Sequence, residues 1–347
     1  MRRNNAIRCV LVLSFIAATC CSCSPSTWWG IRHISGKQKG EEKNESKPPK
    51  SAANQEKRKW WNPFGGKGDT TGRQRGEDLK PASVGDFEKA KLLVKNERDF
   101  AGAKRLLIGV IEANPNHDEA WRWLGDCCYN LLEFTPALDA YNRAREINPN
   151  NYFALRGKGF VLLYLGHEKW QEYDEAIKRK DGEVAQANLS QAHEYYKLAL
   201  ETLQGCMQIY PADDEAAYGR AMAAEGASRF LYSMAVSLRK KEKFADAESW
   251  AKNCLLVIEE GLQAVEMRIR KAPNEMPPSP RALAAGLFLR RAVLLKEFGQ
   301  AEQALVDLEK AITVHRGILQ EVDKNNAKAK VQLQQCEELR AKWQAGE

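Results

Sequence analysis

The chain has 347 residues and a net charge of +7, and its composition is that of an ordinary soluble protein, which excludes collagen, a coiled coil and a bulk membrane protein. The charge is uneven. Residues 24–83 carry 13 basic and 7 acidic residues, whereas residues 84–347 carry 37 basic and 39 acidic ones. Because nucleic-acid binding needs a clustered surplus of Lys and Arg, which the body from residue 84 onward lacks, we expect no nucleic-acid partner.

The N-terminus is typical of an export signal. Three arginines precede or border an eleven-residue, mostly apolar run from Cys9 to Thr19. This run is too short for a permanent transmembrane helix, which needs roughly 20 apolar residues. We therefore predict a signal peptide over residues 1–19 and an exported protein.

The sequence "AATC", which ends at Cys20, resembles the bacterial lipobox, in which a cysteine becomes the lipidated first residue of the mature protein. The match is imperfect, because Ala17 and Thr19 stand where Leu and a Gly or Ala are usual. Cys23 is a second candidate. We predict a lipid on Cys20 that anchors the protein in the cell envelope, facing the periplasm. The alternative is a cleaved signal followed by incidental cysteines.

Residues 20–83 are rich in Lys, Gly, Ser and Asn and poor in Leu, Ile and Val. Such a segment buries too little apolar surface to fold, so we predict a disordered basic tether. It contains two tryptophan pairs, Trp28–Trp29 and Trp60–Trp61. The first pair, near Cys20, suits a lipid headgroup layer, and the second, in "KWWNPFGG", equally suits a docking motif for a partner. A solvated linker is the alternative for both.

From residue 85 onward the sequence repeats with a period of 34, seen best in residues 118–151. The first half of that stretch fits W-x2-L-G, and the second half fits A-x3-[FY]-x2-A-x4-P, a spacing that resembles the tetratricopeptide repeat (TPR). The resemblance implies an all-α, right-handed solenoid of helical hairpins, whose first helices line a concave groove that binds protein segments. The matching residues are Trp121, Leu124, Gly125, Ala137, Tyr141, Ala144 and Pro149.

We predict five hairpins followed by a C-terminal capping helix, in a TPR solenoid that spans residues 84–347. The later hairpins have lengthened helices, because their closing turns come late in the register. Trp170, Tyr173 and Ile177 share one helical face, so we predict a separate short amphipathic helix over residues 167–183, lying on the solenoid. The predicted repeats are about 84–117, 118–151, 152–212, 213–273 and 279–324, with the cap at 326–345.

No catalytic constellation is evident. The five histidines are scattered, and the five cysteines that follow Cys23, from Cys127 to Cys336, form no C-x-x-C pair. We expect these cysteines to pack between helices as small apolar residues. The sequence therefore predicts that the protein is not an enzyme and has no catalytic residue, metal, cofactor or small-molecule substrate.

Projecting the TPR pattern assigns seven residues to the partner-binding groove. They mix charged and aromatic groups, which suits a folded or extended protein segment. We thus predict a lipid-anchored, exported scaffold that binds protein partners in an envelope assembly; the alternative is a membrane- or cell-wall-surface binder that acts through the basic, Trp-rich tether. The predicted groove residues are Arg122, Asp126, Tyr129, Asn130, Arg156, Phe160 and Tyr164.

Overall fold

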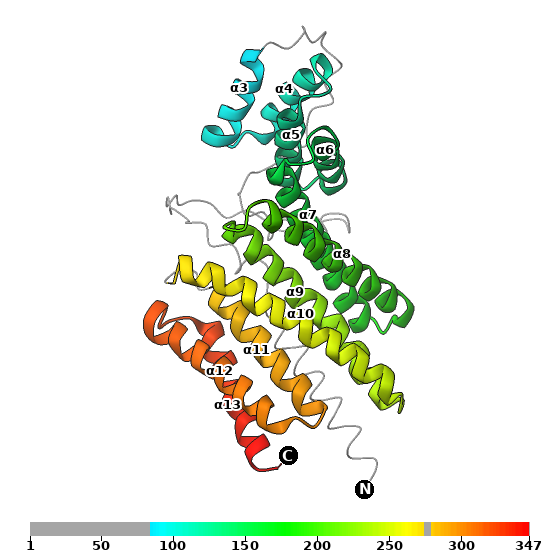
Figure 1. Cartoon of the computed structure of the whole chain (residues 1–347), viewed down its shortest axis with the longest axis vertical. Coiled ribbons are helices and arrows are strands. Elements are labelled where there is room, and N and C mark those ends of the chain that lie inside the picture. The colour runs from blue at the N-terminus through cyan, green and yellow to red at the C-terminus, as the bar shows by residue number, and fades with distance from the viewer. Residues whose placement is uncertain (1–83, 274–278, 347) are drawn as a thin grey trace, which may run out of the picture.

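The structure, a computed structural model, describes residues 84–273 and 279–346, all of them in helices or short connections. The helices form successive antiparallel hairpins that stack along the long axis (Figure 1), which confirms the predicted all-α solenoid. The first part comprises α3 (Val84–Leu92) with the π-helical turn η2 (Leu93–Glu97), α4 (Phe100–Ala113), α5 (Asp118–Asn130) and α6 (Phe134–Ile147). The second comprises α7 (Tyr152–Lys178), α8 (Gly182–Ile209), α9 (Asp214–Lys240), α10 (Phe244–Lys271), α11 (Ser279–Glu297), α12 (Ala301–Gly317) with η3 (Ile318–Val322), and α13 (Ala327–Gln344).

Side chains just before several helices fix where those helices begin. Asn151 accepts a hydrogen bond from the backbone N–H of Ala154 (3.1 Å) at the start of α7. Asp213 accepts bonds from the N–H groups of Glu215 and Ala216 (both 3.1 Å) at the start of α9. Each cap satisfies backbone donors that the first helical turn leaves unpaired and contributes about 1 kcal/mol.

Tyrosines on second helices fill spaces that glycines leave on two consecutive first helices. A Cβ atom on Gly125 of α5 would lie 2.6 Å from the ring of Tyr141, and a Cβ atom on Gly157 of α7 would overlap the same ring. The ring of Tyr196 is placed in the same way between Gly166 of α7 and Gly226 of α9. The hairpins are therefore locked together by large rings against bare backbone, a packing that tolerates almost no added volume.

The third and fourth hairpins have arms about twice as long as those of the second. The arms α5 and α6 have 13 and 14 residues, whereas α7 and α8, like α9 and α10, have 27 and 28. Each arm thus gains 14 residues, which is close to four helical turns and adds about 21 Å. Because the gain is nearly a whole number of turns, the inward face of each helix stays inward.

The prediction of a separate helix over residues 167–183 is wrong. The helix α7 continues without a break to Lys178, and α8 begins at Gly182 after a short turn. Trp170 and Tyr173 do lie on one face, but that face packs against the main core as an outer part of α7. The spacing of apolar residues correctly indicates helix, and no Pro interrupts the segment to end α7 earlier.

The unequal hairpins produce a step in the solenoid. The turn after α5 ends at Glu133 and abuts α7 near Tyr164, so the outer half of α7 extends past it. A cavity of about 370 Å³ lies at this step, lined by the turn and by Tyr164, Leu165 and Glu168. Figure 1 shows the short hairpins at one end of the molecule and the long ones in its middle.

The C-terminal helix α13 covers the last hairpin. Leu333, Leu339 and Trp343 pack against the core that α11 and α12 form. Val331 of the same helix is 54% exposed and takes no part in this contact. All five cysteines in the described ranges are buried and free of disulfides, as predicted.

The long hairpins also bury an ion cluster. Glu225 of α9 accepts hydrogen bonds from Arg229 (2.9 Å) and from Arg290 of α11 (2.8 Å), and all three side chains are largely buried. Burial alone would raise the pKa of Glu225, but the two guanidinium groups outweigh it and hold the pKa below its usual value. This cluster joins consecutive first helices through charge.

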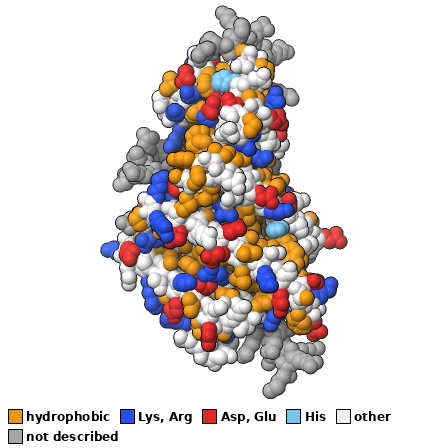
Figure 2. All heavy atoms as spheres, viewed as in Figure 1, with side chains coloured by type: hydrophobic (Ala, Val, Ile, Leu, Met, Phe, Trp, Pro, Cys, Tyr) orange, Lys and Arg blue, Asp and Glu red, His pale blue; other side chains and the backbone are white. Residues whose placement is uncertain are grey.

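On the face shown in Figure 2, basic and acidic side chains are interspersed rather than gathered into one patch of a single sign. Within residues 84–273 and 279–346, no helix combines the length and the apolar character that crossing a membrane requires.

Candidate protein-binding surface

Equivalent positions on α5, α7 and α9 form a continuous polar strip. The 34-residue period places Arg122 of α5 and Arg156 of α7 at the same point of successive hairpins, and Glu119 and Phe153 at the point one turn earlier. In the structure, Arg122 contacts both Glu119 and Phe153, and Phe153 also contacts Arg156. We call this surface the arginine strip and define it as Glu119, Arg122, Asp126, Phe153, Arg156, Asp213 and Glu215.

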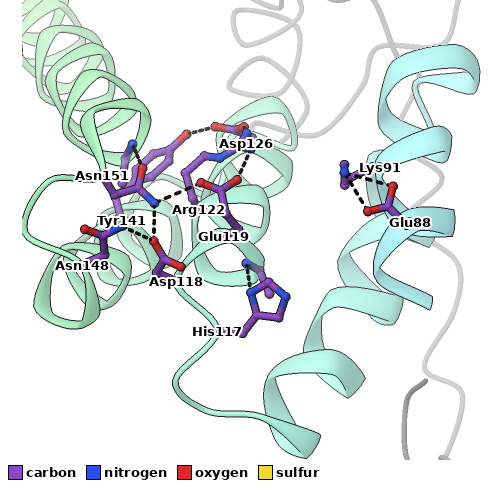
Figure 3. Close-up of polar contacts among 12 residues, drawn as sticks. Glu88, Lys91, His117, Asp118, Glu119, Arg122, Asp126, Tyr141, Asn148 and Asn151 are labelled. Carbon is purple, nitrogen blue, oxygen red and sulfur yellow. Dashed lines mark hydrogen bonds and ion pairs between the residues drawn. The ribbon is translucent and has the colours of Figure 1, made fainter. Parts of the chain in front are cut away.

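Arg122 is held from both sides along α5. Its guanidinium bonds the carboxylates of Glu119 and Asp126, both at 2.7 Å (Figure 3), and only 11% of its side chain is exposed. Burial lowers the pKa of Arg122, but the two carboxylates outweigh this effect and the pKa is raised. The side chain is therefore fixed in one position and fully charged.

Asp126 connects the strip to the core. Its other carboxylate oxygen accepts a hydrogen bond from the hydroxyl of Tyr141 (2.7 Å), whose ring is the one packed between glycines. Asn130 donates to the backbone carbonyl of Asp126 (2.7 Å). Burial raises the pKa of Asp126, and the opposing effects of Arg122 and Tyr141 do not fully cancel it. The hydrogen bond from Tyr141 thus fixes Asp126, because the Tyr141 ring is itself held by the packing between hairpins.

Arg156 repeats the arrangement between α7 and α9. It bonds Glu215 (2.9 Å) and Asp213 (3.2 Å), and Asp213 is the buried residue that caps α9. Burial lowers the pKa of Arg156, but the two carboxylates raise it overall. One guanidinium therefore ties the start of α9 to α7.

Phe153 lies between the two arginines. Its ring centre is 5.5 Å from the guanidinium carbon of Arg122 and 5.3 Å from that of Arg156. The guanidinium carbon of Arg122 also lies 4.0 Å from the centre of the Trp123 ring. These cation–π contacts hold Phe153 although 41% of it is exposed, so the strip presents a fixed apolar ring to solvent.

The strip carries excess negative charge. Each arginine is shared by two carboxylates, so each of the two clusters has a net charge of −1 when its acids are ionised. Glu119 and Glu215 are the more exposed acids, at 42% and 56%. A cation or a peptide N–H group can therefore reach a carboxylate on either side of Phe153.

The remaining predicted residues lie at two other places. Tyr129 contacts Phe134 edge-on (6.2 Å), and Phe134 stacks on Tyr164 (4.0 Å), which is buried at 8% exposure and lines the cavity at the step. Phe160 packs against α9, where a Cβ atom on Gly219 would lie 2.9 Å from its ring. The structure thus brings Arg122, Asp126, Asn130 and Arg156 together and directs Phe160 between helices.

Sequence analysis missed Glu119, Phe153 and Glu215. The sequence does contain a pattern that could have identified two of them. Glu119 and Phe153 each precede a predicted groove arginine by three residues, and they are separated from each other by the 34-residue period. Residues with that spacing occupy neighbouring places on one helical face. Glu215 begins a hairpin after a longer repeat, so the period does not locate it.

A second groove, of about 640 Å³, lies between α10 and α12. Exposed Leu256 and Val306 form part of its apolar lining. Arg291 of α11 and Asp307 of α12 also line it, and Arg291 donates two hydrogen bonds to Asp307, of 2.6 and 2.8 Å. The repeat pattern does not fix the separation of second helices, so the sequence gives no indication of this groove. Nor do the described residues contain a group of three His, Cys, Asp or Glu side chains placed to hold a metal ion.

Comparison with known proteins finds the same repeat. A family model described as a tetratricopeptide repeat matches residues 87–152. No curated protein matches the chain. Among solved structures, MamA residues 41 to the end from Desulfovibrio magneticus RS-1 is 17% identical, covering 68% of this chain and 95% of that chain with a TM-score of 0.39.

Two further solved structures are similar at the same level. YrrB, a TPR protein with an unusual peptide-binding site, is 16% identical, covering 71% of this chain and 89% of that one with a TM-score of 0.40. TTC0263, a thermophilic TPR protein of Thermus thermophilus, is 15% identical, covering 73% and 97% with a TM-score of 0.35. Since all these scores are below 0.5, we base the function on this chain's own residues.

Proposed function

We propose that this TPR solenoid, a protein-binding scaffold and not an enzyme, binds an extended segment of a protein partner on the arginine strip. The observation that carries the proposal is Phe153, an exposed ring fixed between two arginines that are each shared by two carboxylates. Apolar contact at Phe153 would supply affinity. The carboxylates of Glu119 and Glu215 would accept hydrogen bonds from the partner and set its register.

Rigidity supports binding at this place. The strip's side chains are already held by ion pairs and by the hydrogen bond between Asp126 and Tyr141, so little conformational entropy is lost when a partner binds. A surface that serves only to cover the solenoid needs no such network, because exposed ion pairs contribute little to stability.

The test compares two exposed phenylalanines. Once a partner is identified by crosslinking in the native compartment, Phe153→Ala should weaken its binding at least tenfold in calorimetric titration. Phe244→Ala is the matched control, since Phe244 is 55% exposed at the far turn of the fourth hairpin. Equal affinities for the two variants would contradict binding on the strip.

We further propose that the protein is exported and anchored in the cell envelope by a lipid on Cys20, where the scaffold serves an envelope assembly. Support comes from the apolar run and from "AATC", which lie outside the described residues. The mass of the mature N-terminal peptide from membrane and soluble fractions tests this. A diacylglyceryl group on Cys20 would support the proposed anchor. The same group on Cys23 would mean that Cys23 is the lipidated residue instead, and an intact Met1 would contradict export.

A second candidate function is binding to a membrane or cell-wall surface through the tether. It is favoured by the net charge of +6 over residues 24–83 and by the pairs Trp28–Trp29 and Trp60–Trp61, all outside the described residues. Deleting residues 24–83 while keeping the anchor separates the two functions. A scaffold should still capture its partner after this deletion, whereas a tether-driven binder should lose its surface.

A further inference from the structure

We propose that residues 57–64 of the same chain, "KRKWWNPF", dock on the arginine strip, so that the strip has an internal occupant that a protein partner must displace. This inference rests on the proposed function, because both use the same strip. Residues 57–64 precede the described part of the chain, and their sequence combines positive charges with aromatic rings, which complement the acidic clusters and the exposed ring of the strip.

Charge is the first ground for the proposal. The strip has two clusters of net charge −1, one on each side of Phe153, and each includes an exposed glutamate. The segment opens with three consecutive cations, Lys57, Arg58 and Lys59. The same complementarity holds at larger scale, since residues 24–83 have a net charge of +6 and residues 84–347 one of −2. Opposite charges would favour encounter and fix the direction of docking.

Aromatic contact is the second ground. Phe153 is exposed but rigid, a ring that a second aromatic side chain can cover without disturbing its cation–π contacts. Trp60, Trp61 and Phe64 follow the three cations directly. A cationic end would therefore meet one acidic cluster while the aromatic end covers Phe153. Pro63 disfavours a helix and suits an extended segment.

Length agrees with this arrangement. Packed helices lie about 8–10 Å apart, and an extended chain advances about 3.3 Å per residue, so three residues cover one interval between neighbouring first helices. Two intervals, from α5 through α7 to α9, need about six residues, and the segment has eight.

The connection back to the solenoid is also long enough. Nineteen residues separate Phe64 from Val84, where α3 begins the first hairpin. A flexible chain of that length has an r.m.s. reach of about 24 Å, which is about two to three times the 8–10 Å spacing of packed helices. Matched reach gives a tethered ligand an effective concentration in the millimolar range, which lets a weak contact persist. The pair Trp28–Trp29 lies much farther along the chain and lacks the three cations.

The experiment uses the full chain in detergent micelles and a labelled synthetic peptide, KRKWWNPFGG, as the probe. In the variant W60S/W61S the internal segment is disabled, so the peptide should bind at least tenfold more tightly than it binds the wild type. The control W28S/W29S removes the other tryptophan pair and should bind the peptide as weakly as the wild type. Equal affinity for all three chains, or binding by none of them, would overturn the proposal.

The position of the peptide is tested in the same background. Adding Phe153→Ala to W60S/W61S should abolish the gain in affinity, whereas adding Phe244→Ala should leave it. Circular dichroism of each chain before titration excludes unfolding as the cause. A gain that survives Phe153→Ala would place the peptide elsewhere and contradict the proposal.

Partner binding distinguishes failure of this inference from failure of the proposed function. If the partner binds through Phe153 but W60S/W61S changes neither partner nor peptide affinity, the strip binds partners and has no internal occupant. If W60S/W61S frees the strip for the peptide while no partner depends on Phe153, the strip is an internal docking site only. The two proposals together predict that W60S/W61S also tightens partner binding by at least tenfold.

Discussion

The arginine strip and the buried Glu225 cluster use charged residues in different ways. Along α5 and its contact with α7, arginines and carboxylates lie at the surface, where Glu119 remains 42% exposed and can meet a partner. In the long hairpins Glu225 is enclosed with Arg229 and Arg290, at side-chain exposures of 13%, 7% and 5%. The same repeat pattern therefore carries one ion network at the surface, where we propose that a partner binds, and another that is buried between α9 and α11.

The largest expected effect separates these two networks. Glu225→Gln should lower the free energy of unfolding by about 3–5 kcal/mol, because it removes a buried carboxylate charge that bonds two guanidinium groups. Glu119→Gln is the matched change in the arginine strip and should cost less than about 1 kcal/mol, because Arg122 keeps Asp126. Urea unfolding of both variants measures the difference, and equal losses would contradict the contrast.

Two histidines whose pKa values are lowered give the third hairpin and the C-terminal hairpin a pH dependence. Burial lowers the pKa of His167 and of His315 to about 4, and nearby Arg229 and Lys328 respectively add to the effect. Between pH 6.5 and 4 the unfolded chain binds protons that the folded chain does not, so stability falls as the pH decreases through this window, by up to about 3 kcal/mol for each histidine.

Substitution of one histidine checks this dependence. His315 is 1% exposed, so His315→Leu should remove about half of the loss in unfolding free energy measured between pH 6.5 and 5. An unchanged slope in that range would show that other groups control the pH dependence.

A smaller effect tests the glycine packing that supports the strip. Gly157→Ala should destabilise the protein by about 1–3 kcal/mol, because its Cβ would overlap the ring of Tyr141. Gly286→Ala in α11 is the control, since its Cβ would meet nothing within 4 Å, and it should be neutral or stabilise by up to about 1 kcal/mol. Thermal unfolding of the two variants should give shifts of opposite sign or clearly different size.

The local parts of the fold could be predicted from the sequence, and the parts that depend on distant segments could not. The period of 34 and the small residues at Gly125 and Ala137 predict hairpins, because each of these signals acts within one hairpin. The continuity of α7 was missed because an amphipathic pattern shows which face is buried and not where the helix ends.

The candidate site shows the same limit at single residues. Arg122 and Arg156 were found because the repeat places them on one face. Phe160 has the same register as Asp126, yet it packs against Gly219, which belongs to α9 and follows much later in the chain. Which of two equivalent positions packs between helices is thus decided by the next hairpin.

The binding role of the arginine strip can be tested most directly by photo-crosslinking in cells. A benzophenone amino acid replaces Phe153 in one chain and Phe244 in the other, both of which are exposed phenylalanines, and the products are mapped by mass spectrometry. We predict that the probe at position 153 crosslinks to polypeptide, either a partner segment or residues 57–64 of the same chain, well above the yield at position 244. Equal yields at the two positions, or no polypeptide crosslink at position 153, would contradict a protein-binding role for the strip.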